Sequence, residues 1–445
     1  MEEKNFYPDE KSRKMIEELS HYVIAEPYPF VLDLQQCHGM YLTTVGGQKI
    51  FDWAGYYGSK LIGHNHPGLN EPEYREKLLI AANNKIANPD FLTEECLEYY
   101  RLIYKLAPAC MMNKNLEVYT INSGAEAVEN MIKYLINLYD EKMLKRGVNP
   151  QVRRLVYFDR AFHGRTIFAL NVTQLSHDPI ITKDFHGFIP GNLRVPFPST
   201  DSSQSEIWNN RRTENSLSII ENCLRTYGEE VVAIICEPLQ GAGGQRMAQP
   251  DFFRRLSKLA HDYDVFLGFD EVQTAGGQTG TMFAIDQFNL PYPPQAVATA
   301  KKFANGVVYM LNSMTDRGVL DSTWGGSLVD MVRFVQEMKI VRQEQLIEKV
   351  PMKAEYMVSG LNDLAFKYSN LIFNVRGMGL YQGFSMRNPA NKNKLINMAL
   401  QQHHMLLLGA GAQTIRLRPV LDVEIQDIES MLSKLNICLS CLQNG

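Results

Sequence analysis

Two adjacent lysines, Lys301 and Lys302, stand in the segment ATAKKFANGV among small and apolar residues. A lysine pair normally lies on a hydrated surface, whereas the preceding residues 295–300 have the apolar character of a buried strand. An amine that is removed from water loses its proton more easily and becomes a nucleophile near neutral pH. We therefore expect one of these two lysines to form an imine with a carbonyl compound.

Asp270 ends another apolar run, VFLGFD, and Glu271 follows it. A carboxylate at the end of a buried strand is costly unless a cation or a hydrogen-bond donor meets it. One explanation is that the two acids cap the next helix. The other is that Asp270 pairs with the protonated ring nitrogen of pyridoxal 5'-phosphate, which keeps the ring cationic and able to accept electrons.

Two further segments offer groups for a phosphate, a flat ring and a carboxylate. Ser123, Gly124 and Ala125 stand where a strand pattern gives way to a helical one, so they either bind a phosphate or simply cap the helix. In the segment AFHGR, Phe162 or His163 is suited to cover a ring. Arg165 in the same segment offers a planar fork for a carboxylate, or is a surface arginine.

The order of apolar runs along the chain predicts where these groups meet. Short apolar runs alternate with helical patterns, which is typical of a parallel α/β sheet. These runs cover residues 116–122, 154–159, 231–238, 265–272 and 295–301. Ser123, His163, Glu237, Asp270 and Lys301 lie at or just after the ends of these runs. Because ligands bind at the carboxyl edge of such a sheet, we expect one shared site there.

Composition and length predict the organisation of the whole chain. The 445 residues carry a net charge of −4, which favours neither a nucleic-acid nor a membrane partner. We expect residues 71–325 to form a large domain, and residues 1–70 and 326–445 to form the two parts of a smaller α+β domain. The cysteines are scattered and the first 15 residues are charged, so we expect a cytoplasmic protein with no metal site.

Taken together, the motifs resemble the class III (omega-) aminotransferases, which are pyridoxal phosphate enzymes of fold type I, the aspartate aminotransferase-like fold. The matching segments follow the family's order: FDWAGYYGSKLIGHNHP, NSGAEAVEN, AFHGR, CEPLQGAGG, GFDEVQTAGGQTG, AKKFANG, STWGG and IRLRPVL. Within the family, the resemblance is strongest to the L-lysine 6-aminotransferases, through the double lysine, DSTWGGSLVDMVR and GAQTIRLRP.

The resemblance implies a role for each site residue. Ser123, Gly124 and Ala125 would hold the cofactor's phosphate, and Phe162 and His163 would lie against its ring. Asp270 would pair with the ring nitrogen, Val272 would pack on the opposite face, and Gln273 would approach the ring hydroxyl. Thr323 would reach the phosphate of a neighbouring subunit, which implies a homodimer. Arg165 would hold the carboxylate of the amino donor, and Arg416 that of 2-oxoglutarate.

The family pattern also chooses between the two lysines. The imine-forming lysine follows a small residue, and three residues separate it from a pair of further small residues. Ala300, Lys301, Asn305 and Gly306 fit this pattern. We therefore expect Lys301 to bind the cofactor. We expect Lys302 to point elsewhere, as a solvated cation or one beside a phosphate.

One position departs from the family. Ala242, in QGAGG, stands where these enzymes carry a glutamate that covers the Arg416-type arginine while the amino donor is bound. We expect Arg416 to stand uncovered here. The favoured function is transfer of the terminal amino group of a diamino acid, lysine first, to 2-oxoglutarate. The alternatives are ornithine, another ω- or β-amino acid or an amine as donor, and a paralogue that binds the cofactor without turnover.

Overall fold

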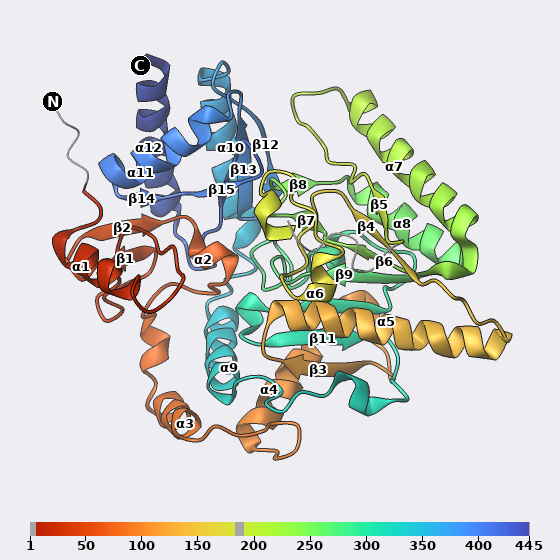
Figure 1. Ribbon diagram of the computed structural model, residues 1–445. Helices are drawn as coiled ribbons and strands as arrows, with labels where there is room; N and C mark the ends of the chain where they lie inside the picture. The colour runs from red at the N-terminus through yellow and green to blue at the C-terminus, as the bar shows by residue number, and fades with distance from the viewer. Residues whose placement is uncertain (1–5, 183–190, 445) are drawn as a thin grey trace.

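The computed structural model describes residues 6–182 and 191–444, and a seven-stranded sheet lies at its centre (Figure 1). In spatial order the strands are β3 (Glu117–Ile121), β11 (Gly306–Met310), β10 (Ala296–Thr299), β9 (Phe266–Asp270), β6 (Val231–Cys236), β4 (Arg154–Phe158) and β5 (Leu193–Val195). The strands from β10 to β5 are parallel, and β11 runs antiparallel to both of its neighbours. All five predicted strands are in this sheet, which confirms the predicted α/β class.

Helices cover both faces of the sheet. Helix α5 (Gly124–Arg146) lies across one face, where Met131 and Leu135 approach Gly268 of β9. The opposite face packs in one hydrophobic cluster with residues of α4 (Glu94–Lys105), α7 (Glu206–Tyr227), α8 (Pro250–Asp262) and α9 (Leu328–Gln343). Side chains alternate as they do in a strand that is buried on both sides: Val297 of β10 belongs to this second cluster, and Ala298 to the α5 side.

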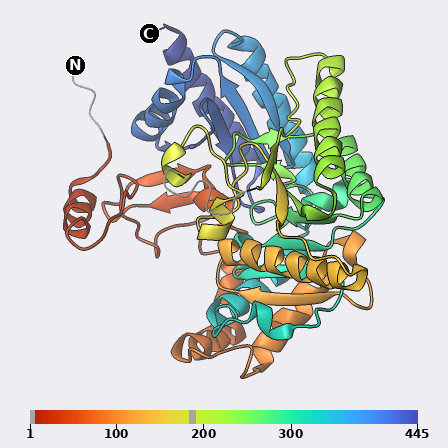
Figure 2. The ribbon, with the colours of Figure 1, turned by 45° about the vertical axis from the view of Figure 1, so that its right-hand side comes forward.

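A second sheet belongs to the C-terminal part of the chain. Its antiparallel strands are β12 (Ile372–Met378), β13 (Tyr381–Met386), β16 (Thr414–Leu417) and β15 (Leu408–Ala410). Helices α10 (Val350–Lys367), α11 (Ala390–His403) and α12 (Ile425–Asn444) pack with it. Figure 2 shows the red N-terminal segment beside this blue region. There β14 (Met405–Leu406) pairs with β2 (Lys49–Asp52), which pairs with β1 (Tyr41–Thr43).

The remaining elements are short or connect the two regions. They are α1 (Glu10–Leu19), α3 (Pro72–Asn83), α6 (Ile167–Leu170), β7 (Leu239–Gln240) and β8 (Arg246–Met247). Helix α9 packs against both α3 and α4. No helix within residues 6–182 and 191–444 has both the length and the apolar character that a membrane span requires.

The segment labelled α2 (Gly55–Gly58) is a left-handed turn rather than an ordinary helix. The φ angles of Gly55, Tyr56, Tyr57 and Gly58 are +52°, +50°, +61° and +77°. Each non-glycine residue in this region costs about 1–2 kcal/mol. A Cβ atom on Gly55 would lie 2.0 Å from the carbonyl oxygen of Arg418, so this end of the turn packs directly against the backbone that follows β16.

This contact predicts unequal effects at two glycines. Gly47 also has a positive φ, +82°, but a Cβ atom there would meet nothing within 4 Å. Gly47→Ala should therefore destabilise the fold by about 1 kcal/mol. Gly55→Ala should cost about 2 kcal/mol or more, because the Arg418 carbonyl must also move. Thermal unfolding of the two variants tests this, and equal midpoints would contradict the packing described for the turn.

Candidate functional site

A cavity of about 320 Å³ opens at the carboxyl ends of β4, β6, β9 and β10, where the sequence predicts a shared site. Its wall includes the first turn of α5 and the loops that follow these strands. The lining residues are Gly124, Ala125, Phe162, His163, Gly164, Arg165, Glu237, Leu239, Ala242, Asp270, Val272, Gln273, Thr274 and Lys301. Every predicted site residue is in this wall except Ser123, Thr323 and Arg416.

Ser123 and Thr323 lie beside the cavity rather than in its wall. Ser123 is the N-cap of α5, and its hydroxyl accepts a hydrogen bond from the backbone N–H of Glu126 at 3.3 Å. Thr323 is exposed in the loop between β11 and α9. The preceding residue, Ser322, accepts a hydrogen bond from the Asn122 side chain at 3.2 Å, which places this loop beside the start of α5.

The cavity floor contains a buried carboxylate–imidazole pair. Oδ2 of Asp270 lies 2.7 Å from Nδ1 of His163, and Oδ1 accepts the backbone N–H of Val272 at 2.9 Å. Burial alone would lower the pKa of His163, but the hydrogen bond and charge of Asp270 outweigh it and raise the pKa. His163 therefore contacts Asp270 directly, a partnership the sequence did not predict. Its Nε2 is buried and has no partner among the described residues.

Lys301 stands at the end of β10 with a positive φ of +50°, which turns its side chain into the cavity. Its Nζ donates to the carbonyl oxygen of Tyr57, in the left-handed turn, at 3.3 Å. Burial lowers the pKa of Lys301 to about 8, and the guanidinium groups of Arg416 and Arg418 act in the same direction. The structure thus gives Lys301 the environment of an amine nucleophile.

The expectation that Lys302 is a solvated cation is wrong, although Lys302 does lie outside the cavity wall that holds Lys301, as expected. Lys302 is only 2% exposed, and it is neither solvated nor among the cavity-lining residues. Its Nζ donates to the carbonyl oxygens of Gly58 and Gln273 and to the hydroxyl of Tyr381. A short helical turn at residues 301–303 directs the two adjacent lysines to different partners, so strand alternation does not apply here.

Arg416 supplies a second, unsatisfied cation. It lies on β16, is buried, and its Nε and Nη1 have no hydrogen-bond partner among the described residues. Burial lowers its pKa to about 10, while Tyr28, Tyr57, Tyr381 and Glu237 oppose that shift. A buried guanidinium with free N–H groups is suited to a carboxylate ligand.

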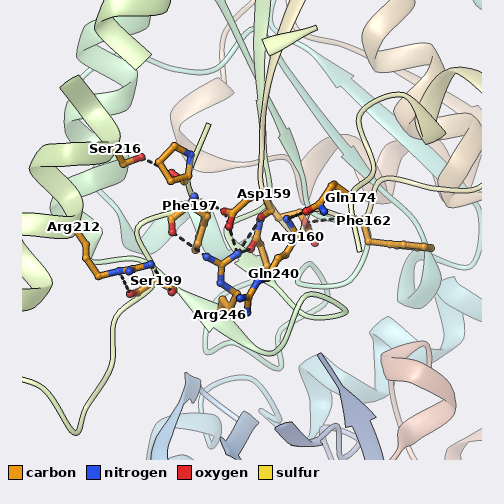
Figure 3. Close-up of polar contacts among 12 residues, drawn as sticks. Asp159, Arg160, Phe162, Gln174, Phe197, Ser199, Arg212, Ser216, Gln240 and Arg246 are labelled. Carbon is orange, nitrogen blue, oxygen red and sulfur yellow. Dashed lines mark hydrogen bonds and ion pairs between the residues drawn. The ribbon is translucent and has the colours of Figure 1, made fainter. Parts of the chain in front are cut away.

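The loop that carries Ala242 is held on two sides. Figure 3 shows Arg246 clamping it to the large domain: Nη1 donates to the Gln240 side chain at 2.6 Å and to the Asp159 carbonyl at 3.0 Å. From the other side, Nε of Arg376 on β12 donates to the Gln245 carbonyl at 2.8 Å. The Ala242 carbonyl accepts the N–H of Gly411 at 3.2 Å. The methyl group of Ala242 is thus fixed in the cavity wall.

Two features of the site carry little signal in the sequence. Burial raises the pKa of Glu237 to about 8, opposed by the nearby charge of His163. Its strand-end position is predicted, but the rise of its pKa depends on burial. The left-handed turn presents the Tyr57 carbonyl to Lys301, and also to the Gln273 amide at 3.1 Å. The only sign of this turn in the sequence is that glycines stand on either side of two tyrosines.

Known lysine aminotransferases are similar to this chain in sequence and in fold. L-lysine-epsilon aminotransferases from Streptomyces clavuligerus and Mycobacterium tuberculosis are 28% identical to this chain, over 94% and 95% of its length and 92% and 94% of theirs. A solved lysine aminotransferase from M. tuberculosis in the internal aldimine form superposes with a TM-score of 0.90, covering 97% of this chain and 99% of that one.

More distant structures share the fold. An ornithine aminotransferase from Toxoplasma gondii, 18% identical, superposes with a TM-score of 0.80 over 98% of this chain and 97% of its own. The family model for class-III aminotransferases matches residues 23–439, which include every cavity-lining residue and both arginines of β16 and its following turn. The chain belongs to the class-III aminotransferases.

Proposed function

We propose that this aminotransferase moves the terminal amino group of L-lysine to 2-oxoglutarate, giving 2-aminoadipate 6-semialdehyde and glutamate. The observation that carries the acceptor is Arg416, whose buried and unpartnered N–H groups lie near the Lys301 amine and match a carboxylate. The choice of lysine rests on the similarity to L-lysine-epsilon aminotransferases over nearly the whole chain.

Pyridoxal phosphate is the cofactor of this enzyme, and the cavity fits it. The first turn of α5 offers backbone N–H groups and the positive end of a helix dipole to a phosphate. A Cβ atom on Gly124 would lie 2.7 Å from Val272, so only glycine lets the turn and Val272 close together. Asp270 supplies a buried anion and Lys301 a desolvated amine on the same wall.

We assign the cofactor contacts as follows. Lys301 binds the cofactor carbonyl, and Asp270, oriented by His163, pairs with the ring nitrogen. Phe162 and Val272 cover the two ring faces, and Gln273 approaches the ring hydroxyl. Ser123, Gly124 and Ala125 hold the phosphate at the start of α5. Support comes from the placement of these groups at one cavity and from the Asp270–His163 contact of 2.7 Å.

We assign the reaction to the chain's own groups in this way. The bound cofactor supplies a carbonyl group for the amine and a cationic ring that accepts an electron pair. Nζ of Lys301 takes the proton from the substrate carbon and delivers it to the cofactor carbon that carried the carbonyl group. Arg165 holds the carboxylate of the donor, and Arg416 holds the carboxylate next to the keto group of 2-oxoglutarate. The cations Arg416 and Arg418 keep the Lys301 amine available as a base.

A second donor class is favoured by one observation. Ala242 takes away the acid that, in the family, covers the Arg416-type arginine while a lysine donor is bound. Ornithine, another ω- or β-amino acid, or an amine therefore remains the alternative to lysine. The 4-aminobutyrate aminotransferase of Schizosaccharomyces pombe is also 28% identical, over 96% of this chain. A panel of donors, scored by glutamate formed from 2-oxoglutarate, decides between them.

We further propose a cytoplasmic homodimer in which Thr323 reaches the phosphate of the partner's cofactor. Large apolar side chains gather in its loop and in the segment that precedes α4: Phe91, Leu92 and Trp324 are 64%, 66% and 39% exposed. Such exposure is typical of a surface that a partner covers. The division at residues 70 and 325 also stays a proposal, supported by the pairing of β14 with β2.

The assignment of Lys301 predicts a spectroscopic difference between the two lysines. Lys301→Ala should lose the visible absorbance of covalently bound cofactor, while Lys302→Met should keep it. In the wild-type apoenzyme, the rate of covalent capture of pyridoxal phosphate should rise with pH and reach half its maximum near pH 8 rather than near 10.5. The reverse pattern of absorbance would transfer the role to Lys302.

The uncovered Arg416 predicts the effect of restoring an acid. Ala242→Glu places a carboxylate in the cavity wall that can pair with Arg416 and compete with 2-oxoglutarate. The KM for 2-oxoglutarate should rise by about 10-fold, which corresponds to about 1.4 kcal/mol. Ala242→Gln has the same shape without the charge and should change this KM much less. Equal effects of the two variants would show that bulk, not charge, governs this position.

The proposed dimer predicts that a change at the subunit contact also weakens cofactor binding. Thr323→Ala should weaken cofactor binding without changing the oligomeric state, because it removes only a hydroxyl. Leu92→Asp should shift the protein toward monomer and weaken the cofactor in parallel, because it places a charge in the proposed contact. Size-exclusion chromatography with light scattering, together with cofactor dissociation rates, measures both. A monomeric wild-type protein that retains its cofactor and activity would contradict the proposal.

A further inference from the structure

Lys302 is a buried cation whose three partners are all uncharged. Its Nζ donates to the Tyr381 hydroxyl at 2.8 Å and to the Gly58 carbonyl at 3.3 Å, and it also bonds the Gln273 carbonyl. Within the described residues, no acid forms an ion pair with it. The nearby Glu271 is occupied by Thr274 and by the backbone N–H groups of Ala284 and Ile285.

These three partners come from three separate parts of the chain. Gly58 ends the left-handed turn of the N-terminal segment, Gln273 follows β9 of the large domain, and Tyr381 begins β13 of the C-terminal sheet. The side chain packs closely against Gly276, where a Cβ atom would lie 2.6 Å from Cε of Lys302. One ammonium group therefore joins three regions directly beneath the cavity.

Two of the three partners of Lys302, Gly58 and Gln273, are next to groups that face Lys301. Gly58 follows Tyr57, whose carbonyl accepts from Nζ of Lys301 at 3.3 Å. Gln273 is itself in the cavity wall, and its side chain bridges the Tyr57 carbonyl at 3.1 Å and Nη2 of Arg418 at 3.2 Å. Moving the Gly58 or Gln273 carbonyl would move the oxygen that orients the Lys301 amine.

A purely structural role does not explain this lysine. A buried ammonium without an acid costs several kcal/mol, and an apolar side chain of similar volume would remove that cost. Methionine has the same unbranched shape and would fill the space beside Gly276 and the Tyr381 ring. The cation at this position, unlike methionine, holds three acceptors in fixed places.

We propose that Lys302 is a positioning residue for the transamination reaction. By holding the Gly58 and Gln273 carbonyls and the Tyr381 hydroxyl, it fixes the Tyr57 carbonyl and the Gln273 side chain around the Lys301 amine. This inference rests on the assignment of Lys301 proposed above. It gives the second lysine a function in the same site although it touches neither substrate nor cofactor.

The test compares Lys302→Met with a matched control in the holoenzyme. Lys353 on α10 is also 2% exposed and donates to a backbone carbonyl, that of Leu421, but lines no part of the cavity. Lys302→Met should still bind pyridoxal phosphate covalently, with weaker circular dichroism of the bound cofactor and faster cofactor release. Its kcat should fall by about 10- to 100-fold, while KM values change by less than about twofold. Lys353→Met should alter thermal stability only.

Tyr381→Phe keeps the result decisive if Lys302→Met folds poorly. It removes only the hydroxyl that Lys302 contacts, so kcat should fall in the same direction but by less. The double variant should be no worse than Lys302→Met alone, because both changes release the same clamp. If Lys302→Met or Tyr381→Phe leaves kcat and the circular dichroism as in Lys353→Met, the positioning role is wrong. Failure of the Lys301 assignment shows separately, as covalent cofactor retained in Lys301→Ala.

Discussion

Three cationic side chains are buried around the Tyr381 ring with a fourth, the half-buried Lys301, close to them, and the site depends on this concentration of positive charge. Lys302 Nζ and the Arg418 guanidinium carbon lie 4.7 Å and 4.3 Å from the centre of the Tyr381 ring, while Arg416 and Lys301 lie nearby. Burial lowers the pKa values of both lysines, and the repulsion between these charges lowers them further. Anionic ligands relieve that repulsion. A phosphate-bearing cofactor and dicarboxylate substrates therefore suit this cavity better than neutral molecules do.

The left-handed turn at residues 55–58 makes this arrangement possible. It presents two successive carbonyl oxygens, those of Tyr57 and Gly58, to two successive lysines. An ordinary right-handed turn would send these oxygens along its own axis to its own N–H groups. The positive φ angles of Tyr56 and Tyr57 are a local cost, sustained by Gly55 against Arg418 and by Gly58 against Tyr381. Strain in the N-terminal segment thus positions the amine at the end of a strand in the large domain.

The sheet and the cavity wall can be predicted from the sequence because both depend on local patterns. Apolar runs that end in Asp270, Glu237 and Lys301 place these groups at one sheet edge, whatever their exact contacts. The burial of Lys302 depends instead on acceptors at positions 58, 273 and 381. Two of these are backbone carbonyls, which have no residue signature. The His163–Asp270 contact joins residues that are 107 positions apart in the sequence, so it follows from tertiary packing. The raised pKa of Glu237 also follows from tertiary packing.

Donor choice follows from which groups can neutralise Arg416. The loop carrying residue 242 is clamped by Arg246 and Arg376, and its residue in the cavity wall is an alanine rather than an acid. Two tyrosines near Arg416, Tyr28 and Tyr57, raise its pKa against the effect of burial. Burial also raises the pKa of Tyr28 itself. Neutral hydroxyls partly satisfy a guanidinium but leave its charge unpaired. A ligand carboxylate therefore gains more binding free energy from Arg416 here than it would in a relative with an acid at position 242. The balance between donor and keto acid shifts toward whichever substrate brings a carboxylate to Arg416.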